Sequence, residues 1–315
     1  MVSQQHYSIR HFGRFEIVTY AFFIAILLSS CSLERLAIKS TTSLLQNMFL
    51  SLEEEEDMEI AEKAIASQLK MLEGLIKSDP ENQDLLLLAA KGFCSYAFSF
   101  IEDHDQEKAK IFYRRGLDYG LQTISSDKSY EGLKKGPTIE KTLNKTDNQN
   151  VPSLFWTAYC WGGLINLSRN SPESLIALPR VEMMMNRALY LDESYYFGGA
   201  NTFLGALYGS LPPMLGGKPE KSKYHFEKAL EENEGKFLMT HVLYARSYAI
   251  QTQEKILFKQ LLDKVVNSPP DILPSQRLAN EIAKKKRESS FKILTSIFNG
   301  EESKKICCGE KVCAY

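Results

Sequence analysis

After the N-terminal segment only three histidines remain, and the spacing of the candidate acid–base or metal-binding residues does not suit such chemistry. The run Glu102–Asp105 includes possible metal ligands, but adjacent side chains diverge, so a solvated turn between two helices is the better interpretation. His225 and His241 fall within amphipathic helical patterns and are expected to serve packing or the surface. The sequence contains no zinc-protease motif, nucleophile elbow or phosphate-binding loop. We therefore expect no enzymatic activity, no metal and no cofactor.

A cysteine near the N-terminus gives the clearest chemical signal. Arg10 and Arg14 precede an apolar core over residues 17–28, which is shorter than the ~20 residues that a bilayer core requires. The core ends in the run Leu28–Cys31, which resembles a bacterial lipobox, where cleavage precedes the cysteine and its thiol receives a diacylglyceryl group. We predict that residues 1–30 are a lipoprotein signal peptide and that Cys31 is lipidated. An ordinary cleaved signal with a chance cysteine is the alternative.

The remaining cysteines do not form an obvious disulfide framework, because five are left once Cys31 is assigned. Cys94 and Cys160 lie in apolar helical patterns and are expected to be buried thiols that act as small apolar side chains. The C-terminal tail, residues 301–315, could bind a metal or form a disulfide, but it has no nearby histidine or second cluster. A frayed tail is the better interpretation of its cysteines, which are Cys307, Cys308 and Cys313.

The composition predicts a globular, all-helical protein. The chain has 315 residues, of which 44% are apolar and 24% charged, and its net charge of −1 lacks the basic excess of nucleic-acid binders. Apolar residues recur at helical spacing, and the run Lys284–Arg287 spreads its charges around one turn, as expected of a solvated face. We expect a lipid-anchored linker over 31–50, a helical domain over 51–300 and a disordered tail over 301–315.

Capping signals and breaks divide the domain into helices. Ser51 and Glu54 have the spacing of a capping box, which predicts a first helix from there to the break at Asp79. Residues 126–150 are polar and form either the least ordered internal stretch or a short-helix excursion. Further helices are expected over residues 85–102, 107–123, 153–167, 175–191, 194–208, 219–231, 236–252, 254–266 and 274–298.

The helices repeat in pairs. Gly205 precedes Ser222 by 222 − 205 = 17 residues, and Gly92 precedes Ala109 by 109 − 92 = 17, as in helix-turn-helix repeats of the tetratricopeptide kind. Residues 211–218 form a loop that a plain repeat would not need. The pattern predicts an all-α fold of tetratricopeptide-like repeats in a compact superhelical array. Such arrays usually present concave surfaces that bind proteins or peptides.

Several stretches lie in order along residues 28–298 and follow the lipobox: Leu88–Phe93, Tyr113–Leu121, Leu154–Tyr159, Gly198–Gly217 and Leu278–Ala283. Together with the lipobox, they resemble the T component (TatT family) of TRAP-type transporters. The chain departs from that family at Asn150, where an acidic residue is expected, and in its cysteine-containing tail.

The resemblance implies a periplasmic protein anchored to the membrane by lipid, with cryptic tetratricopeptide-like repeats. It implies a homotrimer that docks the periplasmic substrate-binding protein of a TRAP system, and an apolar pore or cleft that passes a hydrophobic or amphipathic ligand. Since Ser32 follows the lipidated cysteine, we expect the outer membrane, with the protein facing the periplasm. The alternative function is a general tetratricopeptide scaffold for envelope or outer-membrane assembly.

Aromatic residues are the candidates for lining this pore or cleft. Phe155 and Tyr159 are spaced i, i+4 and share one face of a predicted helix. Core packing is the simpler explanation for any one of these rings. The candidate lining residues are Phe155, Trp156, Tyr159, Trp161, Tyr196, Phe203, Tyr208, Pro212, Leu215 and Gly217.

Overall fold

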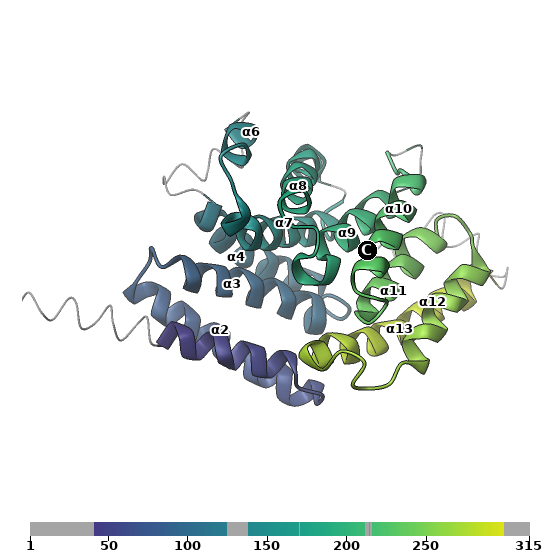
Figure 1. The fold of residues 1–315 in the computed structure, drawn as a ribbon, viewed down its shortest axis with the longest axis horizontal. Helices are drawn as coiled ribbons and strands as arrows, with labels where there is room; N and C mark the ends of the chain where they lie inside the picture. The colour runs from purple at the N-terminus through teal and green to yellow at the C-terminus, as the bar shows by residue number, and fades with distance from the viewer. Residues whose placement is uncertain (1–40, 125–137, 170, 212–213, 215, 299–315) are drawn as a thin grey trace, which may run out of the picture. The chain divides into compact units, whose positions relative to one another are not determined.

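Helices joined by turns make up the described residues, and no strand occurs among them (Figure 1). The computed structural model describes residues 41–124, 138–169, 171–211, 214 and 216–298. Cys31, the signal segment and the tail cysteines lie outside the described residues. The chain divides into two units, Met1–Asn47 and Met48–Tyr315, and a helix over 41–53 spans the boundary. Everything below concerns the second unit, whose all-helical fold confirms the predicted class.

The helices of the second unit follow the predicted pattern to within a few residues at most ends. In order they are α2 (Met58–Ser78), α3 (Gln83–Tyr96), the π-helical turn η1 (Ala97–Ile101), α4 (Gln106–Ile124), α6 (Thr138–Leu143), the 3₁₀ turn η2 (Asn148–Asn150), α7 (Val151–Asn166), α8 (Pro172–Leu191), α9 (Tyr195–Gly209), α10 (Pro219–Glu232), α11 (Leu238–Tyr244), the π-helical turn η4 (Ala245–Ala249), α12 (Lys255–Asn267), the 3₁₀ turn η5 (Pro274–Gln276) and α13 (Arg277–Phe298).

The start of α2 differs from the prediction. Residues 51–53 end the preceding helix, so the expected capping box at Ser51 is wrong. Asp57 caps α2 instead, because its carboxylate accepts hydrogen bonds from the backbone N–H groups of Glu59 (2.8 Å) and Ile60 (3.1 Å). An aspartate at this position satisfies the free N–H groups of a first turn as well as serine does, so the spacing of Ser51 and Glu54 did not decide the boundary.

Helix pairs pack as the repeat pattern predicts, most clearly for α9 and α10. The hydroxyl of Ser222 donates to the carbonyl of Gly205 at 2.7 Å, and a Cβ on Gly205 would lie 2.9 Å from the Phe226 ring. In the first pair, α3 and α4, the space left by Gly92 is filled instead by Leu69 and Phe49. The 17-residue spacing thus marks a direct contact in the pair of α9 and α10.

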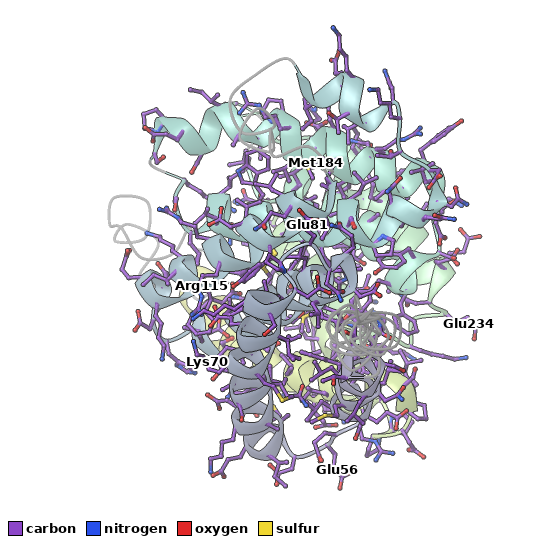
Figure 2. The ribbon with its side chains drawn as sticks, turned by 90° about the vertical axis from the view of Figure 1, so that its left-hand side faces the viewer. Glu56, Lys70, Glu81, Arg115, Met184 and Glu234 are labelled. Atoms are coloured by element: carbon purple, nitrogen blue, oxygen red, sulfur yellow. A yellow bond between two sulfur atoms is a disulfide. The ribbon has the colours of Figure 1, made fainter. Side chains whose placement is uncertain are left out.

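The last helix, α13, returns to the first helices of the unit. It packs on α11 and α12 and also reaches α2 (Figure 1). Glu73 of α2 pairs with Lys70 of its own helix (2.6 Å) and with Arg115 of α4. Lys70 and Arg115 are labelled in Figure 2. α2 itself packs chiefly on α3 and more lightly on α13, and the Arg115 ion pair adds a link to α4.

Two helices predicted as continuous end in a π-helical turn. Glu102 N–H donates to the carbonyl of Ala97 (2.9 Å), and Ile250 N–H donates to that of Ala245 (3.2 Å), five residues back in each case. A π turn holds one extra residue, so the side chains after it are rotated around the helix axis. The stretch Gln83–Ile101 is long and apolar enough to cross a membrane, but 56% of it is buried within the protein, as in a core helix.

Cys94 and Cys160 form a disulfide, so the expectation of two buried thiols is wrong. Cys94 lies on α3 and Cys160 on α7, and their Cα atoms are 5.4 Å apart. Gly116 of α4 lies directly against them, because a Cβ there would be 2.2 Å from the Cys94 sulfur. Periodicity places each cysteine on an apolar face, but only the packing of α3, α4 and α7 brings the two together.

Candidate functional site

We define the aromatic cluster as seven rings from three elements that pack against one another. Trp156 is 4.9 Å from Tyr196 between ring centroids, and Phe155 is 5.3 Å from Tyr195. Phe155 and Trp156 are buried, whereas the other rings are partly accessible. The cluster comprises Phe98 from η1, Phe155, Trp156 and Tyr159 from α7, and Tyr195, Tyr196 and Phe203 from α9.

Glycines let these helices approach closely enough for the rings to touch. A Cβ on Gly162 would lie 2.4 Å from the Phe203 ring, and one on Gly199 would lie 2.9 Å from the Phe155 ring. The i, i+4 pair Phe155 and Tyr159 stacks at 6.1 Å, as its spacing predicts.

A left-handed turn at the start of α9 aims Tyr196 into the cluster. Tyr196, Phe197 and Gly198 have φ values of 49°, 59° and 72°. This backbone region costs roughly 1–2 kcal/mol for each residue other than glycine. The side-chain amide of Asn233 donates to the Phe197 carbonyl at 3.1 Å and so helps to hold the turn. Strain of this kind persists only where surrounding contacts maintain it.

Burial shifts the pKa of two tyrosine hydroxyls in the cluster. Burial raises the pKa of Tyr159 well above its usual value of 10, and the charge of Glu102 adds to the effect. Burial acts in the same way on the pKa of Tyr196, with the charge of Glu53 adding to it. Both hydroxyls therefore stay protonated, and neither forms a hydrogen bond with the part of the chain that the structure describes. By contrast, Tyr195 accepts a hydrogen bond from Trp156 Nε1 (3.1 Å).

A lysine–carboxylate pair borders the cluster beside Trp156 and Tyr196. The Lys91 ammonium lies 5.7 Å from the Trp156 ring centroid and 5.6 Å from that of Tyr196, within range of a cation–π interaction. Its Nζ is 2.5 Å from a carboxylate oxygen of Glu53. Lys91 and Glu53 were missed by the sequence analysis, although a lone lysine in the apolar stretch 85–102 was a usable signal.

A second, deeper charged group borders the cluster beside Phe98. Lys286 Nζ contacts Asp103 (2.8 Å) and Glu102 (3.2 Å) and lies 4.4 Å from the Phe98 ring centroid. The Tyr113 hydroxyl donates to Glu102 at 2.6 Å. Lys286 is only 2% exposed, so the prediction of a solvated face is wrong for this residue. The solvated-turn interpretation is likewise wrong for Glu102, because α13 packs back towards η1 and brings the lysine to it.

The structure brings five of the ten predicted lining residues together in one place. Phe155, Trp156, Tyr159, Tyr196 and Phe203 belong to the aromatic cluster, and whether they line a pore stays a prediction. Trp161 is buried but follows Trp156 by five positions, so it points to another face of α7. Tyr208 is buried, donates to Glu182 (2.7 Å) and packs on His225 (5.5 Å). Gly217 lies in the turn before α10, while Pro212 and Leu215 lie outside the described residues.

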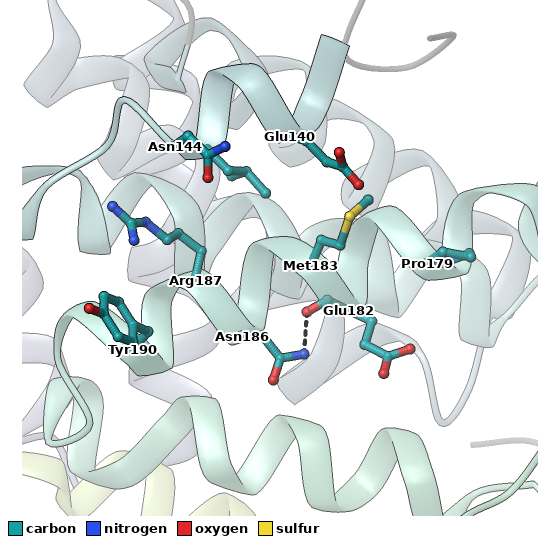
Figure 3. Close-up of a pocket in the computed structure, with 9 residues that line it drawn as sticks. Glu140, Asn144, Pro179, Glu182, Met183, Asn186, Arg187 and Tyr190 are labelled. Atoms are coloured by element: carbon teal, nitrogen blue, oxygen red, sulfur yellow. Dashed lines mark hydrogen bonds between the residues drawn. The ribbon is translucent and has the colours of Figure 1, made fainter. Parts of the chain in front are cut away.

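An open pocket occurs elsewhere, between α6 and α8 (Figure 3). Its volume is about 530 Å³, and its walls combine apolar side chains with charged and amide groups. Arg187 lies over the Tyr190 ring at 5.3 Å and donates to the Thr146 hydroxyl (3.1 Å). The pocket includes none of the predicted lining residues, and its walls are formed by Glu140, Leu143, Asn144, Pro179, Glu182, Met183, Asn186, Arg187 and Tyr190.

Comparison with known proteins places the helical unit in a family. A profile of the TRAP transporter T-component family matches residues 54–294, which include every element of the aromatic cluster. An uncharacterized protein of Treponema pallidum (strain Nichols) is 24% identical over 307 residues, covering 86% of this chain and 94% of that protein. Since the profile spans most of the helical unit, the chain belongs to the TRAP transporter T-component family.

Proposed function

We propose that the protein docks the periplasmic substrate-binding protein of a TRAP system and binds or relays a small hydrophobic or amphipathic ligand. Membership of the T-component family supports a role in TRAP transport. The single observation that supports ligand binding is the aromatic cluster. Its rings other than Phe155 and Trp156 are partly accessible, and its Tyr159 and Tyr196 hydroxyls have no hydrogen-bond partner among the described residues. Half-buried rings with unpaired donors suit an amphipathic molecule better than a purely structural core.

We further propose that the protein is a homotrimer, lipid-anchored at the outer membrane through Cys31, with the helical unit in the periplasm. The disulfide between Cys94 and Cys160 supports an oxidising compartment, since such bonds are rare where thiols are kept reduced. The lipobox before Cys31 supports the anchor, because several acyl chains together hold a protein far more firmly than one.

The anchor is tested by C31A, which removes the thiol that would be acylated. We expect the variant to leave the membrane fraction and to appear in the soluble fraction after cell lysis. A C94A/C160A chain, which keeps Cys31, is the control and should stay with the membrane. An unchanged membrane fraction for C31A would contradict the proposed lipid anchor.

Docking is tested by co-purification. We expect the full chain to retain a TRAP substrate-binding protein of the same organism at micromolar concentration. Failure to retain it at any accessible concentration would count against docking, without bearing on ligand binding.

Ligand binding is tested with 12-bromododecanol, an amphiphile whose bromine quenches tryptophan fluorescence only at close range. We expect quenching in the full chain held in lipid nanodiscs, because Trp156 lies within the cluster. The variant Y196A should quench far less, since it removes a ring in contact with Trp156. The control Y190A changes a tyrosine that is 80% exposed on α8 and should quench like the unchanged chain. Equal quenching in all three would overturn the assignment of the cluster.

A further inference from the structure

The two charged groups that border the aromatic cluster differ in their access to solvent. Lys286 is 2% exposed and is held by two carboxylates, so its end of the cluster is closed. The side chains of Lys91 and Glu53 are 22% and 16% exposed, and each has the other as its charged partner. A ligand can therefore reach Lys91 from solvent far more easily than it can reach Lys286.

We infer that Lys91 anchors the headgroup of an anionic amphiphile, and that Glu53 occupies the position of the ligand's own carboxylate when no ligand is bound. This inference rests on the proposed ligand-binding function and adds the charge class of the ligand and the residue that selects it. The ligand's apolar chain then lies along the rings that follow Lys91.

The position of Lys91 fits a headgroup anchor. Its ammonium carries three donors, of which Glu53 takes one, and it lies over the rings of Trp156 and Tyr196. The Tyr196 ring lies 5.6 Å from this ammonium, and its hydroxyl, protonated and without a partner in the described part of the chain, is a further donor of the cluster. A cationic donor beside aromatic rings favours an anionic oxygen attached to a hydrocarbon chain.

The helix geometry sets the length available to the apolar chain of the ligand. Lys91 and Phe98 lie on the same stretch of helix, seven residues apart, which corresponds to roughly 10 Å at the α-helical rise. Tyr159 bridges this distance, because its ring is 5.4 Å from that of Trp156 and 6.1 Å from that of Phe98. Beyond Phe98 the buried Lys286 group closes the path, so the chain's far end meets an aromatic ring.

Exchange of carboxylates explains how a charged ligand could enter without a large electrostatic cost. A ligand carboxylate that replaces Glu53 leaves Lys91 paired, while Glu53, near the end of the helix over 41–53, turns towards water. A cationic headgroup would have to displace Lys91 from its rings and leave that ammonium without its partner, which is costly in a partly buried site.

The test compares three probes with the same chain and different headgroups, each brominated next to the headgroup so that the bromine of a bound probe lies beside Trp156: 2-bromododecanoate, 2-bromododecanol and 2-bromododecyltrimethylammonium. Tryptophan quenching is measured in the full chain in lipid nanodiscs. We expect the carboxylate probe to bind most tightly, and K91M to weaken it about tenfold, the value of one charge-assisted hydrogen bond. K91R should keep the preference, and E53Q should strengthen carboxylate binding because it removes the competing charge.

The matched control is K218M. Lys218 also lies over an aromatic ring, that of Tyr208 (4.9 Å), and pairs with Glu182 (3.5 Å), but it is outside the cluster. K218M should leave the affinities for all three probes unchanged. Unchanged carboxylate binding in K91M, or tighter binding of the ammonium probe, would overturn the headgroup assignment. Equal binding of all three probes overturns only this inference, whereas quenching by none of them overturns the proposed ligand-binding function itself.

Discussion

Replacing Lys286 with methionine is expected to lower the free energy of unfolding by about 3 kcal/mol, as for other broken buried ion pairs. The lysine is almost completely buried, and it supplies the positive charge that faces both Glu102 and Asp103 across the junction of α13 with η1. Methionine fills similar space but leaves the largely buried Glu102 carboxylate without its ammonium partner and removes the cation that contacts Asp103. The measurement is urea denaturation of the full chain, followed by circular dichroism.

The control for this prediction lies two residues away on the same helix. Lys284 pairs with Glu281 (2.8 Å) and is 25% exposed, so K284M should cost less than about 1 kcal/mol. The triple variant K286M/E102Q/D103N should recover part of the loss, because it removes the unpaired carboxylates as well. Equal losses for K286M and K284M would contradict the buried-pair explanation.

The same group predicts a dependence of stability on pH. Burial opposes ionisation of Asp103, but the charge and hydrogen bond of Lys286, with the charges of Arg246 and His104, outweigh it and hold the pKa of Asp103 below 3.8. The folded state thus binds this proton less tightly than the unfolded state. The ionised Asp103 carboxylate contributes fully to stability above the pKa that this group has in the unfolded state. The contribution is lost as pH falls through the pKa of Asp103 in the folded state.

We expect K286M to lose this acid-dependent part of stability. Denaturation midpoints measured from pH 6 downward should fall less steeply in K286M than in the unchanged chain below about pH 4. Parallel curves for the two chains would show that Lys286 does not set the ionisation of Asp103.

Removal of the disulfide with C94A/C160A is expected to lower the free energy of unfolding by about 4 kcal/mol. The bond joins residues 66 positions apart, and closing so long a loop restricts the unfolded chain strongly. It also ties α3 to α7, which carries three rings of the aromatic cluster. The variant should therefore also bind the ligand probes more weakly. Denaturation with and without reductant measures the loss of unfolding free energy.

Reductant supplies the matched control. It should destabilise the unchanged chain by a similar amount and leave C94A/C160A unaffected. Two thiols at Cys94 and Cys160 that react with a thiol reagent in the native, unreduced protein would contradict the disulfide.

The predictable part of the site followed from local spacing. Phe155 and Tyr159 stack as their i, i+4 spacing requires, and the predicted helix over 107–123 is observed as Gln106–Ile124. Tyr208 was assigned by its residue type alone, and in the fold its ring faces α10 and its hydroxyl Glu182. Spacing gives the face of one helix, but not which other helix covers that face.

By itself, the sequence determined the all-helical class, the order of the helices and the aromatic richness of α7, because each depends on contacts within a few residues. Tertiary structure alone decided that Cys94 meets Cys160, that Lys286 is buried against Glu102, and that Lys91 lies over Trp156. These contacts join residues 65 to 184 positions apart (156 − 91 = 65; 286 − 102 = 184), where helical periodicity carries no information and only the mutual packing of whole helices sets which side chains meet.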